Sequence, residues 1–398
     1  MLSAASAEVV RATLPAVRDH AVEITSAFYP SLFAAHPELL DLFNEGNQAG
    51  GQQRVALASA VVAFAGHLVD RDAAGPGAAP FDAVAERIAH KHVSLGIRPE
   101  QYPVVGRHLL GAVAAVLGDA VTPRVAAAWD EVYQLLARRL VDAEARLYRR
   151  GGIDPGALWR RWRVAKRRDE AVDAVSFTLV PDDGGAVPDF TPGQYVSVAV
   201  DLPGGHRQPR QYSLSQAPGG DALRITVRRV RGVGGAPDGA VSGHLHDHVH
   251  PDHVLLVGPP AGEHTLEPGT SPVLLVSAGI GITPMASMLD HLARTQPTRH
   301  VVLVHGERSP DRHPLRAEVD RLASALTHVE QRTWYERGPG GGLVDVDAIP
   351  LPPGATAHLC GPVPFMRHVR AGLLRRGVPA ARIRYEVFGP GMLDNALD

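Results

Sequence analysis

The stretch Glu86-Arg87-Ile88-Ala89-His90-Lys91-His92-Val93-Ser94-Leu95-Gly96 decides the fold predicted for the first part of the chain. Its apolar residues recur at the spacing of an α-helix and form one apolar stripe. His92 falls on this stripe, whereas His90 falls with Glu86 and Arg87 on the polar face. An imidazole inside an apolar helical core must form a hydrogen bond or bind a metal. We therefore expect His92 to be buried and to have such a partner.

The bulk composition predicts a multidomain globular protein. The chain has 398 residues, which is too long for one ordinary domain. Its net charge of −2 gives no basic surface for a nucleic-acid partner. The single cysteine, Cys360, excludes an internal disulfide and suits a reducing cytoplasm. Since the sequence shows neither an export signal nor an apolar run of about 18 residues, we expect a cytoplasmic protein without a membrane span. We also expect a monomer.

The periodicity of the sequence changes twice along the chain. Residues 1–150 carry the helical spacing throughout and predict an all-α domain. Residues 151–267 contain short alternating segments, which are typical of an antiparallel β-barrel. Residues 268–398 alternate strand and helix, which predicts an α/β domain with a parallel sheet. The expected strands are 176–180, 195–200, 223–230 and 254–257 in the barrel, and 273–277, 301–304, 358–360 and 383–388 in the parallel sheet.

Three further polar side chains lie on apolar helical stripes of the first 150 residues. They are the amide of Gln53, the phenol of Tyr29 and the carboxylate of Glu144. A buried carboxylate is too costly to leave without a partner. Each residue alone is compatible with an ordinary, hydrogen-bonded position in a protein core. Together with His92, they favour a built site in the interior of this domain.

Several short segments of this domain resemble the globin domain of the flavohaemoglobin family. They are Phe28-Tyr29, Leu42-Phe43-Asn44, Gln52-Gln53-Arg54, Lys91-His92 and Pro99-Glu100-Gln101-Tyr102. The resemblance implies a globin fold that binds haem b, with His92 as the ligand of the iron. It also implies distal hydrogen-bond donors (Tyr29, Gln53), walls of the haem pocket (Phe43, Leu57) and two residues placed around His92 (Tyr102, Glu144). Lys91 matches a position at the haem edge, or is a solvated surface residue.

The middle domain contains a motif suited to a flavin. In Arg210-Gln211-Tyr212-Ser213-Leu214, the guanidinium can hold a phosphate, the aromatic ring can cover a flavin face, and the hydroxyl can bond to its edge. An ordinary strand with an ion pair is the alternative interpretation. The motif resembles that of ferredoxin-reductase-like flavin domains, and so do Pro192-Gly193-Gln194-Tyr195 and Pro260-Ala261-Gly262-Glu263. The resemblance implies FAD bound by Tyr195, Arg210, Gln211, Tyr212 and Ser213.

Five histidines between His244 and His253 suggest a metal site at first sight. The same resemblance implies instead that this segment is a helix and a turn covering the FAD. No cysteine lies near the five histidines, and alternate residues point to different faces. Whether the segment binds a metal stays open at this point.

The last domain contains a turn suited to a pyridine dinucleotide. Gly279 and Gly281 allow close approach of the backbone to a pyrophosphate, Thr283 offers a helix cap, and Pro284 fits the first helical turn. The turn resembles that of ferredoxin-reductase-like NAD(P) domains. Two later segments also resemble parts of these domains, namely Leu359-Cys360-Gly361-Pro362 and Tyr385-Glu386-Val387-Phe388-Gly389-Pro390. The resemblance implies that NADH or NADPH is bound by Gly279, Ile280, Gly281, Ile282, Thr283, Pro284, Cys360, Gly361, Pro362, Glu386, Val387, Phe388, Gly389 and Pro390. Phe388 is the implied aromatic cover of the flavin.

The order of the three domains resembles that of flavohaemoglobins along the whole chain. This resemblance implies a nitric oxide dioxygenase, in which electrons pass from NAD(P)H to FAD and then to haem, and NO and O2 become nitrate. Two alternatives are a haem-linked hydroperoxide reductase and an oxygen- or NO-sensing globin with an attached reductase. The choice between NADH and NADPH stays open, because Arg308 and Ser309 suit a 2′-phosphate whereas Glu307 repels it.

Overall fold

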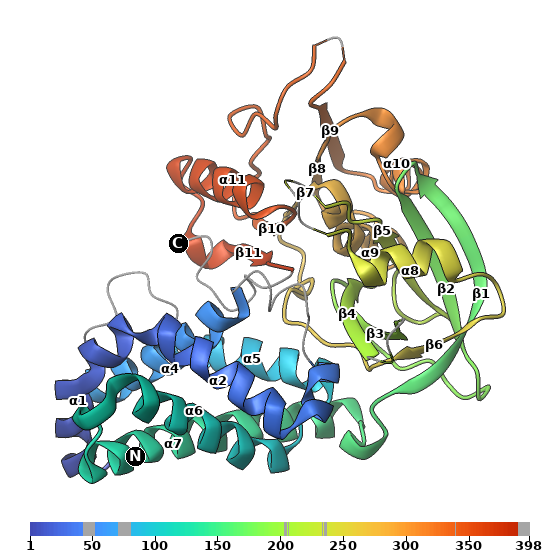
Figure 1. Ribbon diagram of the computed structural model, residues 1–398. Helices are drawn as coiled ribbons and strands as arrows, with labels where there is room; N and C mark the ends of the chain where they lie inside the picture. The colour runs from blue at the N-terminus through green and yellow to red at the C-terminus, as the bar shows by residue number, and fades with distance from the viewer. Residues whose placement is uncertain are drawn as a thin grey trace. The chain divides into compact units, whose positions relative to one another are not determined.

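The computed structural model forms two compact units, built mainly on Met1–Leu158 and on Trp159–Pro203 with Arg210–Phe388. Figure 1 shows the first unit as helices in blue to green and the second as strands and helices in green to red. Each unit is described by itself below. The described residues are 1–42, 52–70, 81–202, 205, 207–232, 234, 237–338 and 340–388.

The first unit is all-α, as predicted. Its helices are α1 (Ala4–Asp19), α2 (Ala21–Ala35), α4 (Gln52–Val69), α5 (Phe81–Leu95), α6 (Tyr102–Leu117) and α7 (Pro123–Gly151), with short 3-10 turns at Pro37–Leu42, Pro99–Gln101 and Gly118–Ala120. The hydroxyl of Thr122 accepts a hydrogen bond from the Val125 amide at 3.3 Å and caps the start of α7. Gly152 ends α7 in the left-handed conformation, at a φ of 59°.

Close packing of α6 against α7 positions the first part of the site. A Cβ atom added at Gly106 would lie 2.3 Å from the ring of Tyr133, so only glycine fits at this contact. The Tyr133 hydroxyl donates a hydrogen bond to the carbonyl oxygen of Tyr102 at 2.6 Å. Tyr133 and Tyr102 belong to one buried cluster that also contains Phe28 and Trp129. The first turn of α6 is therefore held firmly against α7.

The second unit begins with a six-stranded antiparallel sheet. Its strands are β1 (Arg160–Ala171), β2 (Ala174–Pro181), β3 (Tyr195–Asp201), β4 (Arg207–Ser213), β5 (Leu223–Arg228) and β6 (Val254–Val257), in the order β4-β3-β6-β1-β2-β5. A bridge between Leu214 and Ile225 joins the two edges, so the sheet closes as a barrel. The prediction missed β1, because most of its side chains are charged and only alternate residues such as Trp162 and Val164 face the core. It also extended β5 two residues too far.

The unit continues with the predicted parallel sheet. Its strands are β7 (Val273–Ala278), β8 (Val301–Glu307), β9 (Val329–Tyr335), β10 (Thr356–Cys360) and β11 (Ile383–Glu386), in the order β11-β10-β7-β8-β9, with helices α9 (Ile282–Thr295), α10 (Arg316–Ser324) and α11 (Val363–Arg375). All described strand pairs of this sheet are parallel. The prediction missed β9, since this edge strand exposes Glu330, Gln331 and Arg332 and lacks an apolar alternation.

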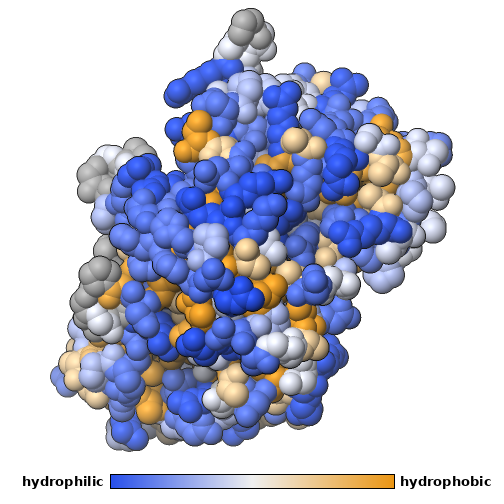
Figure 2. Space-filling view, turned by 90° about the vertical axis from the view of Figure 1, so that its right-hand side faces the viewer, coloured by the Kyte–Doolittle hydropathy of each residue, from blue (hydrophilic) through white to orange (hydrophobic). Residues whose placement is uncertain are grey.

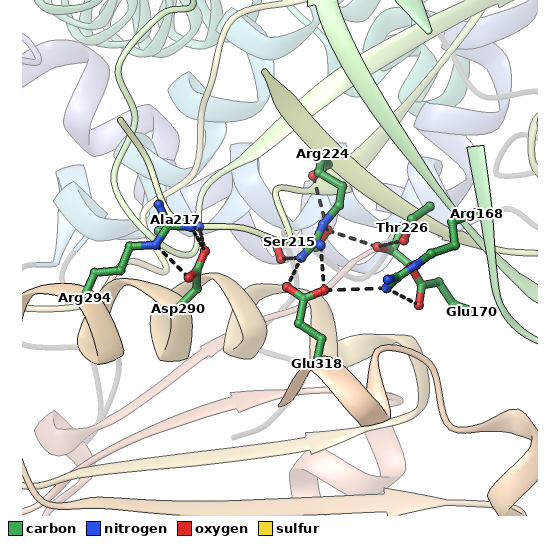
Figure 3. Close-up of polar contacts among 10 residues, drawn as sticks. Arg168, Glu170, Ser215, Ala217, Arg224, Thr226, Asp290, Arg294 and Glu318 are labelled. Atoms are coloured by element: carbon green, nitrogen blue, oxygen red, sulfur yellow. Dashed lines mark hydrogen bonds and ion pairs between the residues drawn. The ribbon is translucent and has the colours of Figure 1, made fainter. Parts of the chain in front are cut away.

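Polar contacts join the barrel to the parallel sheet within the second unit (Figure 3). The guanidinium of Arg224 on β5 donates to both carboxylate oxygens of Glu318 on α10, at 2.7 and 2.8 Å, and also to the backbone of Ser215. The buried carboxylate of Asp290 on α9 accepts the Ala217 amide at 2.7 Å. These contacts hold the helices that cover the sheet against the barrel.

The surface of the described residues is largely polar. The face shown in Figure 2 is mostly hydrophilic, with apolar residues scattered over it. The exposed large hydrophobic side chains are Met1, Val22, Val172, Val230 and Leu343. Among the described helices, none combines the length and the apolar character needed to cross a membrane.

Four histidines are buried in the second unit, and burial disfavours their charged form. Burial lowers the pKa of His264 and of His313 to about 4. It lowers the pKa of His305 and of His358 well below the ordinary value. No hydrogen bond reaches either ring nitrogen of His264 or His358 within the described chain.

These histidines predict that the free energy of unfolding of the second unit decreases as the pH falls. The unfolded chain takes up protons near pH 6.5 and the native state only near 4, so stability present above pH 6.5 is lost progressively between these values. Each histidine contributes up to about 1.4 kcal/mol per pH unit. Urea unfolding at several pH values measures this slope. His264→Gln should reduce it, the same change at exposed His368 should not, and a flat profile would contradict the prediction.

Candidate functional site

The site in the first unit is built around His92, on the last turn of α5. Its Nδ1 lies 2.7 Å from Oε1 of Glu144 on α7 and 2.9 Å from the hydroxyl of Tyr102 on α6. The Tyr102 hydroxyl donates to the same Glu144 oxygen at 2.5 Å. Burial and the neighbouring carboxylate raise the pKa of Tyr102, so the phenol keeps its proton. The structure therefore brings together three predicted residues from three helices.

This arrangement assigns the proton of the His92 ring. A carboxylate only accepts hydrogen bonds, so Nδ1 of His92 carries the proton and donates it to Glu144. The lone pair is then on Nε2, which makes no hydrogen bond with the described part of the chain. A neutral imidazole whose other nitrogen is held by a carboxylate is the usual form of an iron-ligating histidine. The residues present thus fit a haem ligand.

The exposure of the two histidines on α5 differs from the prediction. The His92 side chain is 28% exposed in the protein alone rather than buried. His90 is half-buried rather than solvated, and burial lowers its pKa. The buried stripe of α5 is formed by Ala85, Ile88, Ala89 and Val93. Lys91 is half-buried on the same helix.

The predicted distal residues are described only in part. Tyr29 on α2 is 6% exposed, and its ring lies 4.8 Å from that of Phe28 and 5.7 Å from that of Phe33. Leu57 on α4 lines an apolar cavity between helices, together with Ile24, Val61, Leu109 and Val113. Phe43 and the side chain of Gln53 lie outside the described residues. The distal pair of Tyr29 and Gln53 therefore stays a prediction.

The flavin motif Arg210–Leu214 lies on β4, and this strand ends at Ser213. The Ser213 hydroxyl is buried and has no hydrogen-bond partner among the described residues. This fits a hydroxyl that forms a hydrogen bond with the edge of a bound flavin. Gln211 donates to the Ser197 hydroxyl at 3.2 Å, and the phenol of Tyr212 has a pKa raised by burial. Arg210 is half-buried on the same strand.

Tyr195 and the end of β11 complete this part of the site. A Cβ at Gly262, whose φ is 109°, would lie 3.0 Å from the ring of buried Tyr195. The rings of Tyr195 and Phe388 meet edge to face, with centroids 6.1 Å apart. Glu386 is buried and pairs in register with Cys360, and Val387 packs in the core of the sheet. Gly389 and Pro390 lie outside the described residues.

The nucleotide turn joins β7 to α9, as predicted. Gly279 has a φ of 58°, and a Cβ at Gly281 would lie 2.3 Å from the carbonyl oxygen of Cys360. This close approach places Gly279-Ile280-Gly281 against Cys360-Gly361-Pro362, the second nucleotide motif. Gly281 precedes α9, whose first residues are Ile282, Thr283 and Pro284. The predicted cap was wrong, because the Thr283 hydroxyl donates to the Ile280 carbonyl at 3.0 Å.

The histidine-rich segment forms α8 (Ala240–His248), followed by a turn. The rings of His244 and His248 lie tilted to each other at 55°, with centroids 5.2 Å apart, and Nε2 of His246 forms a hydrogen bond with the Val227 carbonyl at 3.0 Å. Within the described ranges, no group of three or more His, Cys, Asp or Glu side chains is arranged to hold a metal ion. The structure confirms the predicted helix and turn, whereas their position over the FAD stays a prediction.

Sequence reasoning missed Arg228, the last residue of β5. Its guanidinium donates to the buried carboxylate of Glu307 at 2.7 Å and pairs with Asp173 at 3.3 Å. It also lies 2.9 Å from the Cβ position of Gly279. Because these partners are far apart in the sequence, no local motif indicated the cluster.

Comparison with known proteins places this architecture in a family. A globin family model matches residues 26–140, and an oxidoreductase NAD-binding domain model matches residues 275–371. A curated flavohaemoprotein of Bordetella parapertussis is 42% identical, covering 98% of this chain and 99% of that relative. The chain belongs to the flavohaemoprotein family. A flavohaemoprotein of Chromobacterium violaceum is 43% identical, with 98% of each chain covered.

Solved structures support the same membership. The crystal structure of a flavohaemoglobin from Malassezia yamatoensis with bound FAD and haem has a TM-score of 0.86 and 32% identity, covering 98% of this chain and all of that chain. The FAD/NAD-binding domain of a nitric oxide dioxygenase from Vibrio cholerae has a TM-score of 0.56 and 38% identity, covering 58% of this chain and all of its own. This flavohaemoprotein is an oxidoreductase whose cofactors are haem, FAD and NAD(P)H.

Proposed function

We propose that this flavohaemoprotein is a nitric oxide dioxygenase. Two molecules of NO and two of O2 become two nitrates, while one NAD(P)H is oxidised to NAD(P)+ and one proton is released. The observation that carries the proposal is the His92–Glu144–Tyr102 cluster, in a chain that also contains a flavin motif and a nucleotide turn. The proposed domains are residues 1–150 for haem, 151–267 for FAD and 268–398 for the nucleotide.

The proposal gives each residue around haem a role. When bound, haem and FAD supply the electron transfer and oxygen chemistry. Nε2 of His92 holds the iron, and Glu144 keeps the Nδ1 proton on the opposite side of the ring, which makes the imidazole a stronger electron donor. Tyr102 orients the carboxylate through its hydroxyl. Tyr29 and Gln53 would offer hydrogen-bond donors to an oxygen ligand in the haem pocket, where donors of this kind stabilise negative charge.

The residues of the second unit bind and orient the reductant and the flavin. Arg210 holds a flavin phosphate, Tyr195 and Tyr212 pack against the flavin, and the Ser213 hydroxyl, which lacks a partner in the described chain, bonds to its edge. The amides of the Gly279–Pro284 turn bind the pyrophosphate of the nucleotide. Burial raises the pKa of the Cys360 thiol, so Cys360 serves as an uncharged wall. Since one chain carries every site and its cysteine is buried, we propose a cytoplasmic monomer.

A second candidate is reduction of an alkyl hydroperoxide to an alcohol and water with NAD(P)H. The observation that favours it is the hydrogen bond between Nδ1 of His92 and the Glu144 carboxylate at 2.7 Å, because stronger electron donation by an iron-ligating histidine also promotes cleavage of an O–O bond.

The test compares the two substrates on the purified holoprotein. A nitric oxide dioxygenase forms one nitrate per NO in a single turnover and oxidises NAD(P)H in the steady state with NO and O2. Faster NAD(P)H oxidation with alkyl hydroperoxide than with NO would favour the second candidate. Absence of nitrate from a reduced, oxygenated sample given NO would refute the proposed function.

Replacing Glu144 by glutamine should keep haem bound but weaken electron donation to the iron. The neutral amide no longer stabilises the positive charge that develops on the His92 ring, so we expect a higher reduction potential of the haem. Turnover with NO should fall by about 10- to 100-fold. Spectroelectrochemistry and nitrate assays measure both effects. Asp142→Asn, at an exposed carboxylate of the same helix, is the control, and an unchanged potential in the Glu144 variant would contradict the prediction.

A further inference from the structure

The carboxyl end of β8 contains two residues with opposite preferences for the nucleotide. In a dinucleotide-binding sheet, a carboxylate near the adenosine ribose accepts its 2′-hydroxyl and favours NADH, whereas an arginine there accommodates the 2′-phosphate of NADPH. Glu307 ends the second strand of the parallel sheet, and Arg308 follows it directly. The contacts of these two side chains therefore decide which nucleotide the site suits.

The carboxylate of Glu307 is occupied by the protein. Its side chain is 2% exposed, and Oε2 accepts a hydrogen bond from Arg228 at 2.7 Å. Its Oε1 accepts the backbone amide of Arg308 at 2.9 Å. Both oxygens thus have partners, and the negative charge is neutralised by a neighbouring guanidinium. Glu307 neither offers an acceptor to a ribose nor repels a phosphate strongly.

Arg228 is itself held in place by several groups. It pairs with Asp173 at 3.3 Å and donates to the carbonyl oxygen of Arg312 at 2.6 Å. Breaking a buried ion pair leaves an uncompensated charge, which makes release of Glu307 costly. The pair therefore persists when a nucleotide approaches the Gly279 turn.

Arg308 presents the opposite situation. Its side chain is exposed, and its guanidinium makes no hydrogen bond or ion pair with the described chain. Its backbone is fixed at both ends of the residue, by Glu307 Oε1 and by the Arg337 amide, which donates to its carbonyl oxygen at 2.9 Å. Apart from Glu307, the nearest acidic group along the chain is Asp311, which stays ionised because its pKa is lowered, chiefly by a hydrogen bond from Ser309. The Arg308 guanidinium is therefore available to an anionic ligand.

We propose that Arg308 binds the 2′-phosphate of a phosphorylated adenine dinucleotide, and that the Arg228–Glu307 pair withholds the competing carboxylate. The preferred reductant is then NADPH. This inference rests on the proposed function only in taking a pyridine nucleotide as the hydride donor.

The test measures binding of 2′,5′-ADP and of 5′-ADP to the full-length holoprotein by calorimetry. We expect 2′,5′-ADP to bind at least about tenfold more tightly, because a charge-assisted contact to the phosphate is added. Arg308→Gln should abolish the difference between the two ligands. Arg375→Gln is the matched control, since Arg375 is also exposed but lies at the end of α11, away from the carboxyl edge of the sheet. Equal affinities in the unaltered protein would overturn the inference.

A second variant tests the role of the ion pair. Arg228→Gln leaves the Glu307 carboxylate unneutralised, so the ratio of 2′,5′-ADP affinity to 5′-ADP affinity should fall below that of the unaltered protein. An unchanged or increased ratio would contradict the proposal that Arg228 keeps the Glu307 carboxylate from interacting with the nucleotide. If neither NADH nor NADPH reduces the flavin, the proposed function fails, whereas the two binding measurements still decide the inference.

Discussion

Replacing His92 by alanine is expected to abolish the Soret absorption of haem while FAD remains bound and is still reduced by NAD(P)H. His92 is the residue whose Nε2 makes no hydrogen bond with the described chain and whose Nδ1 is held by Glu144. Removal of the only proposed iron ligand leaves the haem iron without a bond to the protein. The described flavin and nucleotide residues, from Tyr195 to Phe388, belong to the second compact unit and do not depend on this ligand.

The experiment compares ultraviolet–visible spectra and bound-iron content of the variant with those of the unaltered protein. His90→Ala is the matched control, because His90 lies two residues away on the same helix and makes no contact with Glu144 in the described structure. Added imidazole should restore part of the haem signal in the His92 variant. Full haem occupancy without imidazole would refute the assignment of His92 as the ligand.

Replacing Gly281 by alanine is expected to slow reduction of the flavin by NAD(P)H while haem and FAD stay bound. The added Cβ would lie 2.3 Å from the carbonyl oxygen of Cys360 and 2.8 Å from the Gly361 nitrogen. These are backbone atoms that cannot move aside as a flexible side chain can, so the nucleotide turn must shift. We expect the KM for NAD(P)H to rise about 5- to 150-fold, as a strain of about 1–3 kcal/mol implies.

Stopped-flow reduction of the flavin at several nucleotide concentrations measures this effect. Gly243→Ala is the control, because a Cβ at Gly243 meets no atom within 4 Å and the residue lies within α8. Dithionite should reduce the flavin and the haem of both variants equally, since it bypasses the nucleotide. A KM unchanged in the Gly281 variant would show that the turn does not contact the nucleotide.

The local pattern of the sequence predicted most elements of the fold. The strand predicted at residues 254–257 matches β6 (Val254–Val257), and the parallel strands β7, β8, β10 and β11 were all expected. The missed strands β1 and β9 carry charged or polar side chains on their exposed faces. Their pairing partners, rather than their own side chains, make them strands. A periodicity argument finds only those elements in which apolar and polar residues recur at a regular spacing along the chain.

In the candidate site, too, the sequence predicted some features and the structure alone revealed others. Helical spacing singled out His92 and Glu144, and the structure joins them at 2.7 Å although 52 positions separate them. The spacing showed which face of the helix His92 occupies, but it did not show that the ring is partly exposed in the protein alone. It also suggested a cap at Thr283, whose hydroxyl bonds to the carbonyl of Ile280 instead.

The sequence by itself determined the three-part architecture, the family resemblance and the residue types available at each site, because periodicity and motifs are properties of neighbouring residues. Only the tertiary structure decided which nitrogen of His92 keeps its proton and whether the Glu307 carboxylate is available to a nucleotide. These depend on Glu144 and Arg228, which are distant in sequence and reach their partners only when the helices and strands pack. Electrostatic pairing acts over a few ångströms in space, whatever the separation along the chain.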